Sequence, residues 1–109
     1  MAVATTVLIR SLARAQHYSL SQHAEEERQA EQIRLSEIES ALREAEIIEH
    51  YPGDVRGPSC LALGFAGSCP LHLVCAVKDA PRELLLITVY DPSLQPQRWE
   101  ADFRRRRTT

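Results

Sequence analysis

Polar side chains suited to acid/base chemistry occur within two short apolar runs in the second half of the chain. His72 lies in the run 71–74, and Thr88 and Tyr90 lie in the run 86–90. Successive side chains of a strand point to opposite faces, so Thr88 and Tyr90 are expected on one face. Histidine can move a proton near neutral pH, and a hydroxyl or phenol can hold a phosphate oxygen. These residues are candidate catalytic groups for phosphodiester cleavage; the alternative is an ordinary half-exposed sheet face.

A further candidate for proton transfer is His23, which precedes Glu26 and Glu27 by three and four residues. On a helix, this spacing places the three side chains on one face. A histidine beside carboxylates suits the role of general acid. The alternative is a solvated, charged helix face.

Arginines that can bind a substrate phosphate lie in a loop and near the C-terminus. Arg56 lies in a predicted turn, and Arg104 and Arg105 begin a run of four arginines. A guanidinium binds phosphate through two parallel hydrogen bonds. Arg56, Arg104 and Arg105 are therefore candidate substrate-binding residues; the alternative is a surface loop and a solvated tail. Trp99 is expected to dock the final segment on the domain.

The charge of the chain is distributed unevenly. The net charge is −2, but residues 23–54 carry ten acidic residues against three arginines. Four of the basic residues that follow lie in the C-terminal run. A nucleic-acid-binding protein needs a basic patch where the phosphates lie, so only the C-terminal half can supply one. The acidic, helical half must then face elsewhere, which argues against a strong general affinity for nucleic acid.

Several classes of protein are not supported by the sequence. The three cysteines include no Cys-x-x-Cys pair, so we predict neither disulfides nor a metal site and expect a cytoplasmic protein. We find no glycine-rich phosphate loop and no nucleophile elbow, so we expect no cofactor. No apolar run approaches the ~20 residues of a membrane span, so no membrane partner is expected.

The first half of the chain is predicted to be helical. Residues 1–17 lack acids and carry apolar residues at helical spacing, which predicts an amphipathic extension, with a transit peptide as the alternative. The domain itself is expected over residues 18–109. A capping pattern begins the second helix at Ser19, with Gln22 three residues later. Helices are predicted over residues 5–15, 20–32 and 36–45.

The second half is predicted to form strands separated by turns that contain proline and glycine. The strands are expected over residues 47–51, 60–65, 71–77 and 83–90. Their short connections favour antiparallel hairpins. The sequence therefore predicts an α+β domain in which N-terminal helices pack on one face of a four-stranded antiparallel sheet.

Short motifs spread along most of the chain resemble a known family. They are Ser21-x-His23-Ala24, Ile47-Ile48-Glu49-x-Tyr51-Pro52-x-Asp54, Ser59-Cys60-Leu61, Pro70-Leu71-His72, Ile87-Thr88-Val89-Tyr90-x-Pro92, and Trp99 with Asp102-Phe103-Arg104. Over roughly residues 18–107 the chain resembles the bacterial domain-of-unknown-function family 4258. Of these motifs, Pro-Leu-His followed by Ile-Thr-Val-Tyr is fairly specific.

The resemblance implies a fold akin to the barnase, colicin and RelE group of ribonucleases, and a toxin encoded beside a small antitoxin. In that light His23, His72, Thr88 and Tyr90 match positions that recur in the family pattern, and Arg56 matches a loop position. We therefore expect a metal-independent endoribonuclease toxin that cleaves mRNA. The alternative is a non-catalytic module of the same fold that binds a protein or RNA.

Overall fold

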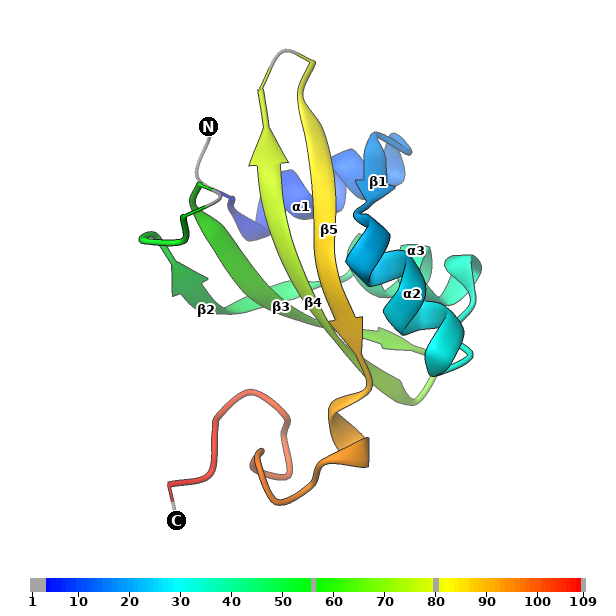
Figure 1. Ribbon diagram of the computed structural model, residues 1–109, viewed down its shortest axis with the longest axis vertical. Coiled ribbons are helices and arrows are strands. Elements are labelled where there is room, and N and C mark those ends of the chain that lie inside the picture. The colour runs from blue at the N-terminus through cyan, green and yellow to red at the C-terminus, as the bar shows by residue number, and fades with distance from the viewer. Residues whose placement is uncertain (1–3, 56, 80, 109) are drawn as a thin grey trace.

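The computed structural model describes residues 4–55, 57–79 and 81–108, within which the chain forms three α-helices and five strands (Figure 1). The helices are α1 (Thr6–Arg14), α2 (Gln22–Ala30) and α3 (Leu35–Arg43). The strands are β1 (Tyr18–Leu20), β2 (Glu46–Tyr51), β3 (Ser59–Ala66), β4 (Cys69–Lys78) and β5 (Glu83–Tyr90). This arrangement confirms the α+β class. Among the described residues, no helix is long and apolar enough to cross a membrane.

The prediction of a four-stranded, wholly antiparallel sheet was wrong. The sheet has five strands in the order β1-β5-β4-β3-β2, and β1 pairs in parallel with residues 84–86 of β5. Ser19 therefore lies in a strand, and α2 begins after Ser21, whose hydroxyl accepts a hydrogen bond from the amide of Ala24 at 3.0 Å. A three-residue strand contains too little alternation to be separated from the helix that follows it.

Helices α1 and α3 cover one face of the sheet and form the core with it. Each helix buries one apolar stripe, as its spacing predicts. The buried residues are Ile9, Leu12 and Ala13 in α1 and Ile38, Ala41 and Leu42 in α3. The backbone of α3 lies directly on β3 at Gly64, where a Cβ atom would overlap the backbone of Ala41.

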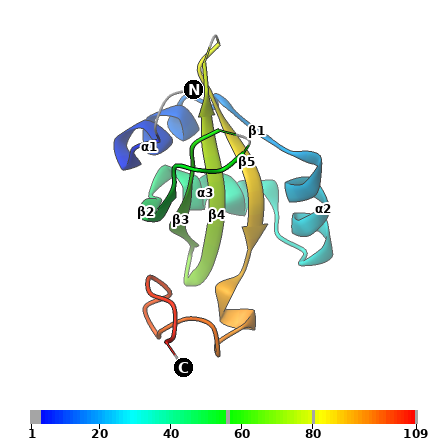
Figure 2. The same cartoon turned by 60° about the vertical axis from the view of Figure 1, so that its left-hand side comes forward.

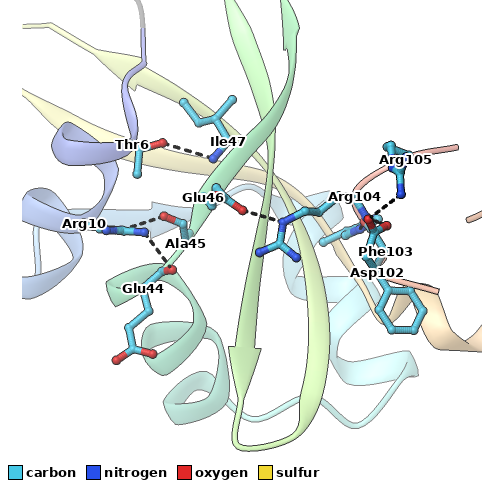
Figure 3. Close-up of polar contacts among 11 residues, drawn as sticks. Thr6, Arg10, Glu44, Ala45, Glu46, Ile47, Asp102, Phe103, Arg104 and Arg105 are labelled. Atoms are coloured by element: carbon cyan, nitrogen blue, oxygen red, sulfur yellow. Dashed lines mark hydrogen bonds and ion pairs between the residues drawn. The ribbon is translucent and has the colours of Figure 1, made fainter. Parts of the chain in front are cut away.

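Helix α1 is also tied to the segment that joins α3 to β2. The guanidinium of Arg10 donates to the carbonyl of Ala45 at 2.8 Å, and the amide of Ile47 donates to the hydroxyl of Thr6 at 3.2 Å (Figure 3). These bonds satisfy a carbonyl that follows α3 and an amide of the edge strand β2.

Helix α2 lies apart from the other two helices, beside the edge of β5 (Figure 2). Beyond the end of β1, the amides of Val89 and Asp91 donate to the carboxylates of Glu27 and Glu31 at 3.0 and 2.9 Å. Four residues of a helix rise about 6 Å, which is close to the rise of two residues of a strand. Two carboxylates of the polar helix α2 therefore accept the hydrogen bonds that a neighbouring strand would otherwise accept from this part of β5.

The sheet face opposite α1 and α3 carries the polar residues of β4 and β5. His72 lies opposite Tyr90 and Val74 lies opposite Thr88, so these residues share that face. The register then shifts at Ile87, which has no partner residue on β4. The shift turns Thr88 and Tyr90 to the face opposite that of Leu84 and Leu86, which belong to the core.

Candidate active site

His72 is fully buried, and both nitrogens of its imidazole have partners. Its Nε2 lies 2.7 Å from the carbonyl oxygen of Phe103, and its Nδ1 lies 3.1 Å from the hydroxyl of Tyr90. A carbonyl only accepts, so Nε2 carries the proton, and Nδ1 of the neutral ring accepts from Tyr90. Burial lowers the pKa of His72, against the opposing effect of the Phe103 carbonyl, so the neutral ring is favoured.

The C-terminal segment covers the ring of His72, so this part of the sheet is not the half-exposed face of the alternative interpretation. The indole of Trp99 packs edge-on against the imidazole, with 4.3 Å between the ring centroids, and only 2% of Trp99 remains exposed. Trp99 thus docks the final segment as predicted. His72 is placed to orient Tyr90 and the C-terminal segment rather than to touch a substrate.

Residues 98–107 form a small hairpin, called here the C-terminal hairpin. Trp99 and Arg106 make an antiparallel bridge within it, and Phe103 adopts a left-handed conformation with a φ of 60° at its turn. Arg106 lies over the Trp99 ring at 4.7 Å and donates two hydrogen bonds to Glu49 of β2, at 2.8 and 3.0 Å. The hydrogen bonds to Glu49 raise the pKa of Arg106, and they hold the hairpin against β2.

A cavity of about 480 Å³, called here the β5 cleft, opens between α2, the end of β5 and the C-terminal segment. It gathers side chains that are far apart in the sequence. They are Glu27, Glu31, Thr88, Tyr90, Asp91, Leu94, Gln95, Arg98, Trp99 and Arg106. The cleft thus unites both candidate hydroxyl groups of the sheet with two arginines.

Three groups of the β5 cleft can bind or protonate a phosphate ester. Burial raises the pKa of Tyr90, with the nearby Arg106 opposing, so its phenol stays protonated at neutral pH. Within the part of the chain that the structure describes, the guanidinium of Arg98 forms no hydrogen bond or ion pair and is exposed. Thr88 is half-buried and lines the same cleft. Arg98 is the cation of the cleft that is available to an anion.

His23 lies next to the β5 cleft through its contact with Glu27. Its Nε2 is 3.4 Å from Glu27 Oε1, and 64% of the His23 side chain is exposed. The same Glu27 oxygen accepts a hydrogen bond from the backbone amide of Val89, and this bond holds the carboxylate in place. Glu26, which the sequence places on the same helical face, accepts a hydrogen bond from the side-chain amide of Gln22 instead. The structure thus brings His23, Thr88 and Tyr90 to one region.

The predicted substrate-binding arginines lie elsewhere. Arg56 lies outside the described residues. Arg104 forms an ion pair with Glu46 at 2.8 Å, and Arg105 forms one with Asp102 at 3.3 Å. Both arginines line a separate groove of about 330 Å³ beside β2.

The sequence missed Arg98 and Glu31 as members of the site. Glu31 follows Glu27 by four residues on a polar helix, and this spacing is the signal that could have indicated it. Arg98 has no comparable signal, because its position depends on how the C-terminal hairpin folds. A second cavity, of about 500 Å³ between α1, α3 and the β3–β4 turn, contains none of the predicted site residues.

Comparison with known proteins identifies a family but no characterised relative. No curated protein and no solved structure matches the chain. A family model described as domain of unknown function (DUF4258) matches residues 20–91, which run from the end of β1 to the end of β5. The match includes His23, Glu27, Thr88 and Tyr90, and it ends before the C-terminal hairpin. Because the model covers more than half of the chain, the protein belongs to the DUF4258 family.

Proposed function

We propose that this protein is a metal-independent endoribonuclease that cleaves mRNA and acts as the toxin of a bacterial toxin–antitoxin pair in the cytoplasm. The supporting observation is the β5 cleft, where Arg98 and Tyr90 lie near the His23–Glu27 pair. RNA cleavage of this kind needs a base for the 2′-hydroxyl, an acid for the leaving 5′-oxygen and a cation for the phosphorane-like state. Together, the cleft and the adjoining His23 offer one group for each role.

In the proposed reaction, Nε2–H of His23 faces Glu27, and Nδ1 accepts the proton of the 2′-hydroxyl. The 2′-oxygen then bonds to phosphorus while the bond from phosphorus to the 5′-oxygen breaks. Tyr90 turns its phenolic proton from His72 Nδ1 to the leaving 5′-oxygen and gives it up there. Tyr90 then regains a proton from water, and His23 releases its extra proton to the resulting hydroxide. Arg98 and Thr88 hold the non-bridging oxygens, whose negative charge increases in the transition state. The products are a 2′,3′-cyclic phosphate and a 5′-hydroxyl.

The proposal includes a fold akin to barnase, colicin and RelE, on the basis of the family resemblance and the α+β layout. It also includes a small antitoxin as partner. The chain carries a local charge excess of −7 over residues 23–54. A basic segment of the antitoxin would be attracted to this region, next to the site that it must block.

A second candidate function is a non-catalytic interaction module. One observation favours it: Arg104, Arg105, Arg106 and Arg107 all form ion pairs with carboxylates of the chain. Such internal pairing weakens the long-range field that would attract RNA to this surface.

The first test is expression of the chain alone in a bacterial host, beside His23→Ala and Arg98→Gln variants. The matched control is His50→Ala, because His50 is an exposed histidine of β2 outside the β5 cleft. If the protein is a ribonuclease toxin, the wild type and the His50→Ala control should both arrest growth. His23→Ala and Arg98→Gln should both relieve the arrest. Normal growth with folded wild-type protein would instead favour the interaction module.

A further inference from the structure

We propose that the C-terminal hairpin binds phosphates of single-stranded RNA through Arg104 and Arg105, which carboxylates of the chain neutralise until RNA displaces them. The inference rests on the proposed function only for the identity of the polyanion. It assigns a second contact surface outside the β5 cleft and explains why an RNA-binding segment would carry its own acids.

The two ion pairs are exposed to solvent. Arg104 Nε lies 2.8 Å from Glu46 Oε1, and the two side chains are 47% and 48% exposed. Arg105 is 78% exposed and lies 3.3 Å from Asp102 Oδ2 (Figure 3). Water screens such pairs and their long side chains lose entropy on ordering, so their net stabilisation is small. A phosphate oxygen can therefore replace either carboxylate at little cost.

Arg106 differs from its neighbours and does not take part in this exchange. It donates two hydrogen bonds to Glu49, lies over Trp99, and keeps the hairpin docked on the sheet. The Glu49 side chain is only 22% exposed. The hairpin therefore combines one structural arginine with exchangeable ones, and loss of the exchangeable pairs leaves its anchor intact.

The position of the hairpin suits a strand of RNA that leaves the site. Its residues Arg98 and Arg106 line the β5 cleft, whereas Asp102, Arg104 and Arg105 line the groove beside β2. That groove also contains Ile47 and Ile48 of the edge strand. A chain of nucleotides that passes from the cleft to the groove would cross the hairpin, with one phosphate near each exchangeable arginine.

The test measures binding of a fluorescent single-stranded 2′-O-methyl RNA by anisotropy over a range of salt concentrations. This RNA has no free 2′-hydroxyl to attack phosphorus, so it cannot be cleaved by the proposed reaction. We expect Arg104→Gln/Arg105→Gln to reduce the slope of log K against log[salt] by about 1.4, since each phosphate contact on a single strand contributes about 0.7. We expect Glu46→Gln/Asp102→Asn to tighten binding about fivefold, because it removes the competing carboxylates.

The charge-matched control is Asp79→Asn/Glu83→Gln, which removes two carboxylates that pair with Arg82 and Lys78 at the β4–β5 turn. Screening confines the effect of charges to about 8 Å, so this control should change the affinity less than twofold. Equal tightening by the control, or an unchanged salt slope in the double arginine variant, would overturn the inference. The 2′-O-methyl RNA reports binding alone, and cleavage is followed separately on RNA that carries 2′-hydroxyls, so a failure of cleavage and a failure of the hairpin contact are read separately.

Discussion

Replacement of His72 by alanine tests the structural role assigned to the buried imidazole. The ring is fully buried, packs edge-on against Trp99, and makes hydrogen bonds at 3.1 and 2.7 Å to Tyr90 and Phe103. Its removal leaves a cavity and an unsatisfied carbonyl, and it releases the phenol of Tyr90. We expect the variant to lose stability and to detach the C-terminal hairpin before the rest of the sheet unfolds.

The magnitude follows from the two contacts and the cavity. An unsatisfied buried polar group costs about 1–3 kcal/mol, and the lost ring leaves a cavity with a cost of similar size. Tyr90 is half-buried, so water can reach its hydroxyl and reduce the first cost. We therefore expect a decrease of about 3 kcal/mol in the free energy of unfolding, which lowers the Tm of a domain of this size by roughly 15 °C.

The same residue makes stability depend on pH with a known sign. Burial lowers the pKa of His72 below its usual 6.5, so the unfolded chain binds the proton more tightly. The stabilisation is fully present above pH 6.5 and decreases as the pH falls below 6.5 towards the folded-state pKa. Urea denaturation of the wild type and His72→Ala between pH 5 and 8 measures the pH dependence of the free energy of unfolding. The difference between the two proteins isolates His72, since both contain the other three histidines.

Two results would refute this reasoning. One is a loss below about 1 kcal/mol at pH 7, which would mean that neither contact matters for the fold. The other is an identical pH dependence in the two proteins, which would place the titrating group elsewhere. The matched control His50→Ala removes an exposed histidine and should change the free energy of unfolding by less than about 0.5 kcal/mol.

Two other predictions concern the core. Gly64→Ala should destabilise the fold by at least about 2 kcal/mol in urea denaturation, because the added methyl group overlaps the Ala41 backbone; an unchanged midpoint would contradict the close approach of α3 to β3. A thiol reagent at pH 8 should modify Cys69 first in the native protein, because Cys60 and Cys75 are fully buried, and burial raises the pKa of Cys60 to about 11 and that of Cys75 well above its usual value. Simultaneous modification of all three would disprove this packing.

The parts of the fold that the sequence predicts are those encoded locally. The apolar stripe of α3 and the turns between β3, β4 and β5 depend on neighbouring residues, so their spacing is visible in the sequence. Strand β1 and the unpaired Ile87 depend on register with distant residues, and nothing in their local pattern indicates it. The extra strand and the bulge were therefore missed.

The candidate site was predicted in part for the same reason. Thr88 and Tyr90 share a face because strand alternation is local, and His23 lies beside Glu27 because helical spacing is local. The burial of His72 and the place of Arg98 depend on the C-terminal hairpin, which folds back on the sheet through Trp99. No short-range sequence pattern indicates that the C-terminal segment packs back on the sheet.

The most direct test of the central claim is incubation of the purified protein with a labelled single-stranded RNA in the presence of a chelator, followed by analysis of the new ends. If the β5 cleft is a metal-independent ribonuclease site, fragments with 2′,3′-cyclic phosphate and 5′-hydroxyl ends will accumulate. His23→Ala and Arg98→Gln will each slow their formation by at least about tenfold, while His50→Ala will cleave like the wild type. Intact RNA with folded wild-type protein, or equal cleavage by wild type and both cleft variants, would contradict the account.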